Sequence, residues 1–142
     1  MSRFLFVVPP LLGHTLPTIA LGKELADRGH QVAWAGHTET VGPLLPPEAK
    51  LIPVDVDVGG QTLAQIQHRF QGLRRIAAFR FLWTDFLIPL ATSMVPGVAA
   101  AVDEFDPDVV IADQQALAGA LVARQRGLTW ATSATMSSEL TN

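Results

Sequence analysis

The hydrophobic positions of this chain alternate between short continuous runs and longer stretches with helical spacing. Between the runs, helical spacing with start and stop residues predicts helices at 15–28 and 115–127. The continuous apolar run at 4–8 predicts a central strand buried on both faces, and further strands are predicted at 31–36, 50–56, 108–113 and 128–133. Strands that alternate with helices indicate an α/β fold, here a Rossmann-like open parallel sheet with helices on both faces.

The first predicted helix has both of its ends marked in the sequence. Thr15 is a candidate N-cap, Pro17 falls in the first turn, and Gly29 is the stop. The apolar residues that recur at helical spacing predict its core-facing side: Leu16, Ile19, Ala20, Leu25 and Ala26.

The region from Thr62 to Phe105 predicts two or three helices, broken near Pro89 and at Pro96-Gly97. Its apolar stretch 81–102 is about as long as a membrane span. However, Asp85 and the two prolines make a poor span. We therefore expect buried or pocket-lining helices, while peripheral contact with a membrane surface stays open.

Composition narrows the class of protein. The 142 residues fit one domain, and 49% hydrophobic against 16% charged residues excludes a disordered chain. The net charge of −3, without a basic block, argues against a nucleic-acid partner. Without cysteine the chain has no disulfide or thiolate chemistry, which suits a cytoplasmic protein. The four histidines lack paired metal-ligand spacing, so no metal is expected.

The end of the sequence follows the last predicted strand closely, before any helix that would cover it. Doubly wound domains seldom end in this way. We therefore expect residues 1–142 to be a fragment of a longer protein.

Two polar residues fall at the edge of the predicted sheet where such folds bind their ligands. His14 follows the first strand and Asp113 ends the fourth, so both belong to the carboxyl edge. A carboxylate on one imidazole nitrogen leaves the other as a base. Since no G-x-S-x-G nucleophile motif is present, the base would deprotonate a substrate hydroxyl. The alternative, that both residues only cap or pack locally, stays open on position alone.

Other residues near this edge are candidates for binding. The loop before His14 has a single glycine, Gly13, so it is neither a dinucleotide-binding loop nor a P-loop. Gly13 and His37, which follows the second strand, are candidates for contact with a substrate. Phe79, Trp83 and Phe86 belong to an aromatic segment that either fills a core or walls a cavity for a bulky apolar ligand.

Two longer motifs resemble a known family. "FLFVVPPLLGHTLPTIALGKELADRGHQVAWAG" resembles the opening of family 1 glycosyltransferases of the GT-B fold, with their G-H-x-x-P loop and a helix that ends in R-G-H. "FDPDVVIADQQALAGALVARQRGLTWA" resembles their P-D-x-V-x-x-D strand and the helix and strand after it. The bacterial group acting on macrolides, other polyketides and carotenoids, in natural-product and antibiotic biosynthesis, is the most similar.

The resemblance implies a role for each part. His14 would be the general base, Asp113 its partner, and residues 1–142 the N-terminal acceptor-binding domain of an inverting glycosyltransferase. The co-substrate would be a UDP- or dTDP-sugar and the acceptor a hydroxyl of a bulky apolar natural product, with no cofactor or metal. The C-terminal domain that binds the nucleotide sugar is absent from these residues, so the fragment alone should be inactive.

One alternative function stays open at the sequence level. A stand-alone, non-catalytic α/β module could bind an apolar metabolite or activate a partner enzyme. Binding of an apolar ligand without any sugar donor would favour that alternative.

Overall fold

A five-stranded parallel sheet forms the centre of the computed structural model, which describes residues 1–135. The strand order is β3-β2-β1-β4-β5, and each neighbouring pair is parallel. The strands are β1 (Arg3–Val7), β2 (Gln31–Gly36), β3 (Lys50–Pro53), β4 (Val109–Asp113) and β5 (Thr129–Ser133). The predicted open parallel sheet is therefore confirmed.

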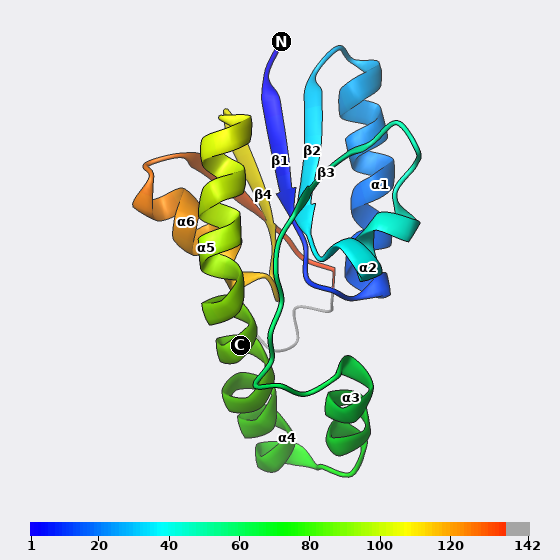
Figure 1. Cartoon of the computed structure of the whole chain (residues 1–142), viewed down its shortest axis with the longest axis vertical. Helices are drawn as coiled ribbons and strands as arrows, with labels where there is room; N and C mark the ends of the chain where they lie inside the picture. The colour runs from blue at the N-terminus through cyan, green and yellow to red at the C-terminus, as the bar shows by residue number, and fades with distance from the viewer. Residues whose placement is uncertain (136–142) are drawn as a thin grey trace.

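Helices cover both faces of the sheet, as predicted (Figure 1). On one face lie α1 (Leu12–Asp27), α2 (Thr38–Val41) and a short 3-10 turn, Gly42–Leu44. On the other lie α5 (Ile88–Phe105) and α6 (Leu117–Gln125). Alternate residues of β1 supply the two apolar layers, because successive side chains of a strand point to opposite faces. Leu5 and Val7 pack in the α5 layer, and Phe6 stacks on Trp34 in the α1 layer.

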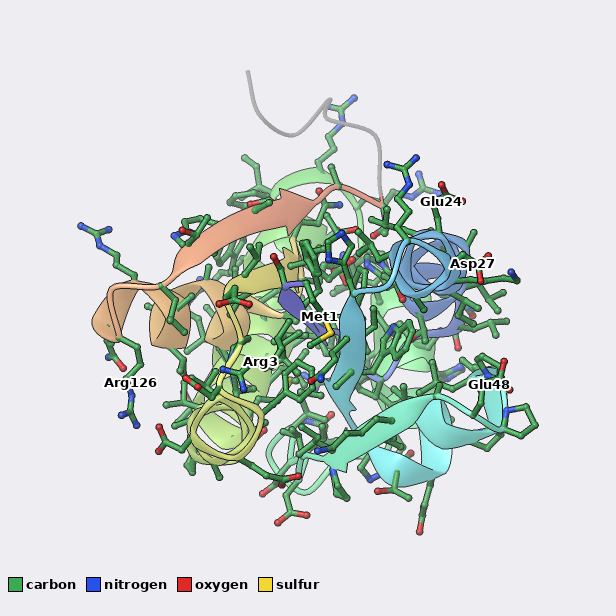
Figure 2. All side chains as sticks on the ribbon, turned by 90° about the horizontal axis from the view of Figure 1, so that it is seen from above. Met1, Arg3, Glu24, Asp27, Glu48 and Arg126 are labelled. Carbon is green, nitrogen blue, oxygen red and sulfur yellow. The ribbon has the colours of Figure 1, made fainter. Side chains whose placement is uncertain are left out.

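Charged side chains project from the outside of these layers, as the labelled Glu24, Asp27, Glu48 and Arg126 show (Figure 2). The hydrogen bond to Asp27, together with the attraction of its carboxylate, raises the pKa of Lys23. Both side chains are mostly exposed, so this ion pair adds little to stability. The fold therefore rests on its two apolar layers.

Helix α1 begins earlier than the sequence indicated, and the prediction that Thr15 is its N-cap is wrong. The cap is Leu11, in extended conformation and without a side-chain cap bond. Thr15 is buried inside the first turns, where its hydroxyl donates to the Leu11 carbonyl. Pro17 consequently lies inside the helix.

The buried face of α1 also differs from the predicted one. Its buried residues are His14, Thr15, Thr18 and Gly22, whereas Leu16 is 48% exposed. The reason is the indole of Trp34, which lies against this helix and donates from Nε1 to Thr18 Oγ1 at 2.9 Å. A Cβ at Gly22 would lie 2.3 Å from the Trp34 ring. Small and polar side chains are needed for α1 to reach the sheet.

A lobe beyond the carboxyl ends of the strands contains α3 (Leu63–Gln71) and α4 (Arg75–Phe81) (Figure 1). α4 continues through a π-helical segment, Leu82–Leu87, into α5. The predicted breaks at Pro89 and Pro96-Gly97 are therefore wrong. The wider π-helical turn just before Pro89 is a known way to accommodate a distorted hydrogen-bond ladder.

The continuous helix Arg75–Phe105 is long and apolar enough to cross a membrane by length and composition alone. Of its most apolar 18-residue window, 44% is buried inside the fold. Val98 and Ala101 are fully buried in the core beneath the sheet. Core helices of soluble proteins meet the same criterion, so this feature is weak evidence for a span.

Candidate active site

The fold brings His14 and Asp113 together across 99 positions of sequence. His14 is the third residue of α1, directly after β1, and Asp113 is the last residue of β4, the strand beside β1. The His14 Nδ1 and Asp113 Oδ1 atoms are 2.8 Å apart. His14 is 8% exposed and Asp113 2%, so this is a close pair in a largely water-free setting.

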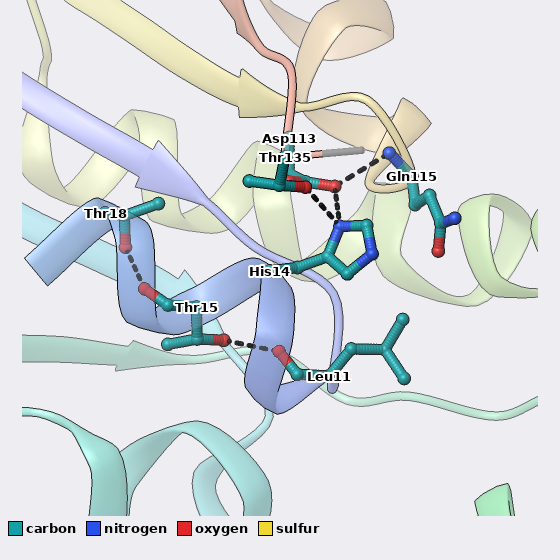
Figure 3. Close-up of polar contacts among 7 residues, drawn as sticks. All are labelled: Leu11, His14, Thr15, Thr18, Asp113, Gln115 and Thr135. Carbon is teal, nitrogen blue, oxygen red and sulfur yellow. Dashed lines mark hydrogen bonds and ion pairs between the residues drawn. The ribbon is translucent and has the colours of Figure 1, made fainter. Parts of the chain in front are cut away.

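The carboxylate of Asp113 is satisfied at both oxygens. Oδ1 also accepts from the backbone N–H of Gln115 at 2.8 Å, and Oδ2 accepts from the hydroxyl of Thr135 at 2.8 Å (Figure 3). A buried charge is tolerated only when it is paired and hydrogen-bonded, and both conditions hold here. These bonds fix the orientation of the carboxylate.

The second ring nitrogen of His14 points away from Asp113. An ionised carboxylate only accepts hydrogen bonds, so Nδ1 carries the proton and Nε2 keeps a lone pair. Figure 3 shows Nε2 on the side where Leu11 and Gln115 extend their side chains. The hydrogen bonds that the structure gives for the His14 ring within residues 1–135 are both at Nδ1. The pair has the arrangement of a general base that is held by a carboxylate.

An apolar cavity of about 300 Å³ shares Leu11 and Gln115 with this site. Seven apolar side chains and two glutamines line it: Leu11, Leu63, Ile66, Phe70, Phe81, Leu82, Phe86, Gln67 and Gln115. Ligand sites are mostly apolar with a few polar groups, and this cavity fits that description. A hydroxylated apolar molecule in this cavity would lie beside Leu11 and Gln115, which extend on the same side as His14 Nε2.

Helix α3 forms one wall of the cavity, and side-chain contacts link it to α4 and to the π-helical segment. Arg69 lies over the ring of Phe81 at 4.7 Å, and its guanidinium also donates to Gln61 and Asp85. A capping box at Thr62 starts α3. These contacts hold the wall in place without closing the cavity.

The predicted binding residues lie at different places. Phe86 lines the cavity. Phe79 and Trp83 contact each other on the outside of the lobe, 54% and 38% exposed. Gly13 has open space around it, and His37 lies at the start of α2 with Nδ1 3.3 Å from Thr40 Oγ1. The binding roles of these five residues, counting Phe86, stay predictions.

Sequence reasoning missed Thr135 and the wall formed by α3. Leu63, Ile66 and Phe70 recur at i, i+3 and i+7, a helical spacing that was available as a signal. Thr135 follows β5, so the rule that ligands bind at the carboxyl edge also pointed to it. Nothing in its local sequence distinguishes it from Thr132.

Within residues 1–135, no group of three or more His, Asp or Glu side chains is placed to hold a metal ion. The expectation that no metal takes part stays a prediction.

Comparison with known proteins shows the family to which the chain is similar. Residues 12–142 match the family described as glycosyltransferase family 28 N-terminal domain. The chain is 34% identical over 133 residues to zeaxanthin glucosyltransferase of Pseudescherichia vulneris, covering 90% of this chain and 30% of that protein. It is 25% identical over 129 residues to 4'-demethylrebeccamycin synthase of Lentzea aerocolonigenes, covering 89% and 31%. The chain therefore spans less than a third of either relative.

Solved structures show the same fold. The glycosyltransferase SnogD from Streptomyces nogalater aligns with a TM-score of 0.71 at 22% identity, over 94% of this chain and 34% of that one. The glycosyltransferase VinC in complex with dTDP aligns with a TM-score of 0.66 at 21% identity, over 90% and 33%. The predicted N-terminal half of a GT-B fold is confirmed, although the matching family is numbered 28 rather than 1.

Proposed function

This chain belongs to the glycosyltransferase family 28 N-terminal domains, and from that premise we propose that it is the acceptor-binding and base-supplying half of an inverting glycosyltransferase. The observation that carries the proposal is the buried pair of His14 and Asp113, with Nε2 of the imidazole turned away from the carboxylate. The pair lies beside an apolar cavity.

The proposed chemistry gives His14 and Asp113 one role each. Nε2 of His14 takes the proton from the acceptor hydroxyl as its oxygen bonds to the anomeric carbon of the sugar. The bond from that carbon to the nucleotide diphosphate breaks, and its electron pair leaves with the diphosphate. Attack opposite the leaving group inverts the configuration. Asp113 stabilises the imidazolium that forms, because its carboxylate lies 2.8 Å from Nδ1.

The proposed acceptor is a hydroxyl of a bulky, apolar natural product. The lining of Phe70, Phe81 and Phe86 favours flat or unsaturated carbon frameworks. One relative is named for its action on zeaxanthin, which supports a hydrophobic acceptor.

The proposed co-substrate is a UDP- or dTDP-sugar. Solved neighbours of this fold include complexes with dTDP, and these support a nucleotide sugar. No phosphate-binding loop follows β1, where Gly13 is the single glycine. We propose that a second, donor-binding domain completes the enzyme and that residues 1–142 alone do not transfer sugar.

A hybrid enzyme tests the proposal. Residues 1–142 replace the matching segment of the Pseudescherichia vulneris zeaxanthin glucosyltransferase, and transfer from UDP-glucose and dTDP-glucose to zeaxanthin and 1-naphthol is measured. We expect His14→Ala to lower the rate at least a hundredfold. His68→Ala, at an exposed position of α3, should leave it unchanged. Equal rates in both variants would contradict the base assignment.

The cavity also supports a second candidate function, a non-catalytic module that binds an apolar metabolite or activates a partner enzyme. This candidate predicts that the 142-residue chain binds 1-naphthol without a donor while the hybrid transfers no sugar. Sugar transfer by the hybrid enzyme that depends on His14 would contradict it.

We also propose that the outer side of the lobe makes peripheral contact with an anionic membrane surface. Ile76, Phe79 and Trp83 form an exposed apolar row along α4 and the π-helical turn. The segment 62–86 carries four arginines and one acidic residue, so its charge is opposite in sign to that of the whole chain. Co-sedimentation with phosphatidylglycerol vesicles, reduced by Phe79→Ser and not seen with phosphatidylcholine, is the expected result. Equal sedimentation with both lipids would contradict it.

A further inference from the structure

We propose that Thr135 is a positioning residue, whose hydroxyl holds His14 in the single tautomer that can act as a base. This inference rests on the site of the proposed function, although its main test needs neither substrate nor sugar transfer. Thr135 Oγ1 lies 2.7 Å from His14 Nδ1 and 2.8 Å from Asp113 Oδ2. Together with the 2.8 Å contact between Nδ1 and Oδ1, these contacts link the side chains of His14, Asp113 and Thr135 into one hydrogen-bonded network.

Counting protons in this network leaves one arrangement that satisfies every atom. The hydroxyl of Thr135 has one proton, which it donates to Asp113 Oδ2. Its oxygen can then only accept from Nδ1. Asp113 Oδ1 also only accepts, so the Nδ1–H of His14 is shared between two oxygens.

The opposite tautomer is penalised because of this hydroxyl. With the proton on Nε2, the lone pair of Nδ1 would face Asp113 Oδ1 at 2.8 Å. Thr135 would have to turn its proton to Nδ1, and Asp113 Oδ2 would lose its donor while the side chain of Asp113 remains fully buried. The Thr135 hydroxyl therefore adds to the preference that Asp113 alone would give.

Thr135 is also suited to this task by its place and its shape. It lies beyond the end of β5, and Asp113 pairs with Ser133 in that strand. A β-branched side chain has few χ1 rotamers, so the hydroxyl needs little additional restraint. Thr135→Val keeps the shape and removes only the hydroxyl, whereas Thr135→Ser keeps the hydroxyl.

Nitrogen-15 NMR of the histidine rings in the 142-residue chain is the direct test. In the neutral imidazole of wild type we expect only the Nδ1–H form of His14. In Thr135→Val the Nδ1–H form should remain the main one, because Asp113 still favours it. The Nε2–H form should rise to a detectable minor population, and the Nδ1 proton should exchange with water about 10-fold faster. Thr135→Ser should behave as wild type, and so should Thr132→Val, at an exposed position of β5. If valine perturbs folding, Thr135→Ala replaces it.

A valine or alanine variant that keeps the single Nδ1–H form with the wild-type exchange rate would overturn the proposal. So would a serine variant that behaves as valine does.

Kinetics of the hybrid enzyme give a second readout. Thr135→Val should lower kcat about 10-fold and leave the KM for the acceptor within twofold, and Thr135→Ser should restore kcat. A purely structural role would change KM and thermal stability together and would not be rescued by serine. If the hybrid transfers no sugar in any form, the proposed function fails, while the NMR result still decides the role of Thr135.

Discussion

Replacing Asp113 by asparagine removes the charge of the site and leaves its shape. The amide oxygen of asparagine can accept from His14 Nδ1 and from the backbone N–H of Gln115, as Oδ1 of the carboxylate does. The amide nitrogen then faces Thr135, whose hydroxyl oxygen can accept. We therefore expect Asp113→Asn to fold, with a loss of unfolding free energy below about 3 kcal/mol.

The effect on transfer should be much larger than the effect on folding. The Nδ1 to Oδ1 distance of 2.8 Å places the centres of the imidazolium and carboxylate charges about 4 Å apart. At an effective dielectric constant of about 20, their attraction is worth about 4 kcal/mol. That attraction develops only as His14 takes the proton, so it acts on the transition state. Its loss corresponds to about a thousandfold in rate.

The assay is kcat/KM of the hybrid enzyme with saturating UDP-glucose, alongside circular dichroism to confirm folding. The matched control is Asp103→Asn, since Asp103 forms an exposed ion pair with Arg126 and removal of its charge should not change transfer. A folded Asp113→Asn enzyme with a rate within threefold of its parent would refute the argument that the carboxylate stabilises the imidazolium.

Three further changes test the cavity and the packing of the fold. Phe86 is 5% exposed and lines the cavity, so Phe86→Ala should reduce the free energy of unfolding by about 3 kcal/mol and lower Tm by about 10 °C. The same change should weaken 1-naphthol binding, and an unchanged Tm in calorimetry would contradict this expectation. Gly22→Ala should destabilise the chain by about 1–3 kcal/mol, because its Cβ would overlap Trp34, whereas Gly13→Ala, in open space, should not; urea unfolding compares the two. Thr62→Ala removes the side-chain cap of α3, which should destabilise that helix by about 1 kcal/mol. Amide hydrogen exchange should therefore accelerate at the start of α3 and stay unchanged in β1.

The sequence predicted the central strands β1 and β4 well, because buried parallel strands are continuous apolar runs with clear stop signals. Gly29 and Gly127, both with positive φ, end α1 and α6 as their positions indicated. The pairing of His14 with Asp113 was also predictable, because His14 follows β1 and Asp113 ends β4, and the carboxyl ends of these neighbouring strands meet at one edge.

The parts that could not be predicted depend on contacts between distant segments. The apolar residues of α1 suggested the wrong buried face, since the Trp34 ring requires Thr18 and Gly22 against it. The prolines suggested breaks because the π-helical turn that accommodates Pro89 has no signature in the sequence. Phe86 and Phe79 are the same residue type in the same aromatic segment. Only the packing of the lobe places Phe86 at the cavity and Phe79 on the outer side.

The side chains of His14, Asp113 and Thr135, which form one hydrogen-bonded network, come from segments that are far apart along the chain. His14 lies at the start of α1, Asp113 lies 99 positions later, and Thr135 lies 121 positions after His14. Contacts of such long sequence separation form late in folding, because the loops between them must close first. The network of His14, Asp113 and Thr135 can therefore form only after β5 has docked beside β4. Before that point in folding, the His14 imidazole lacks the two partners that orient it in the proposed mechanism.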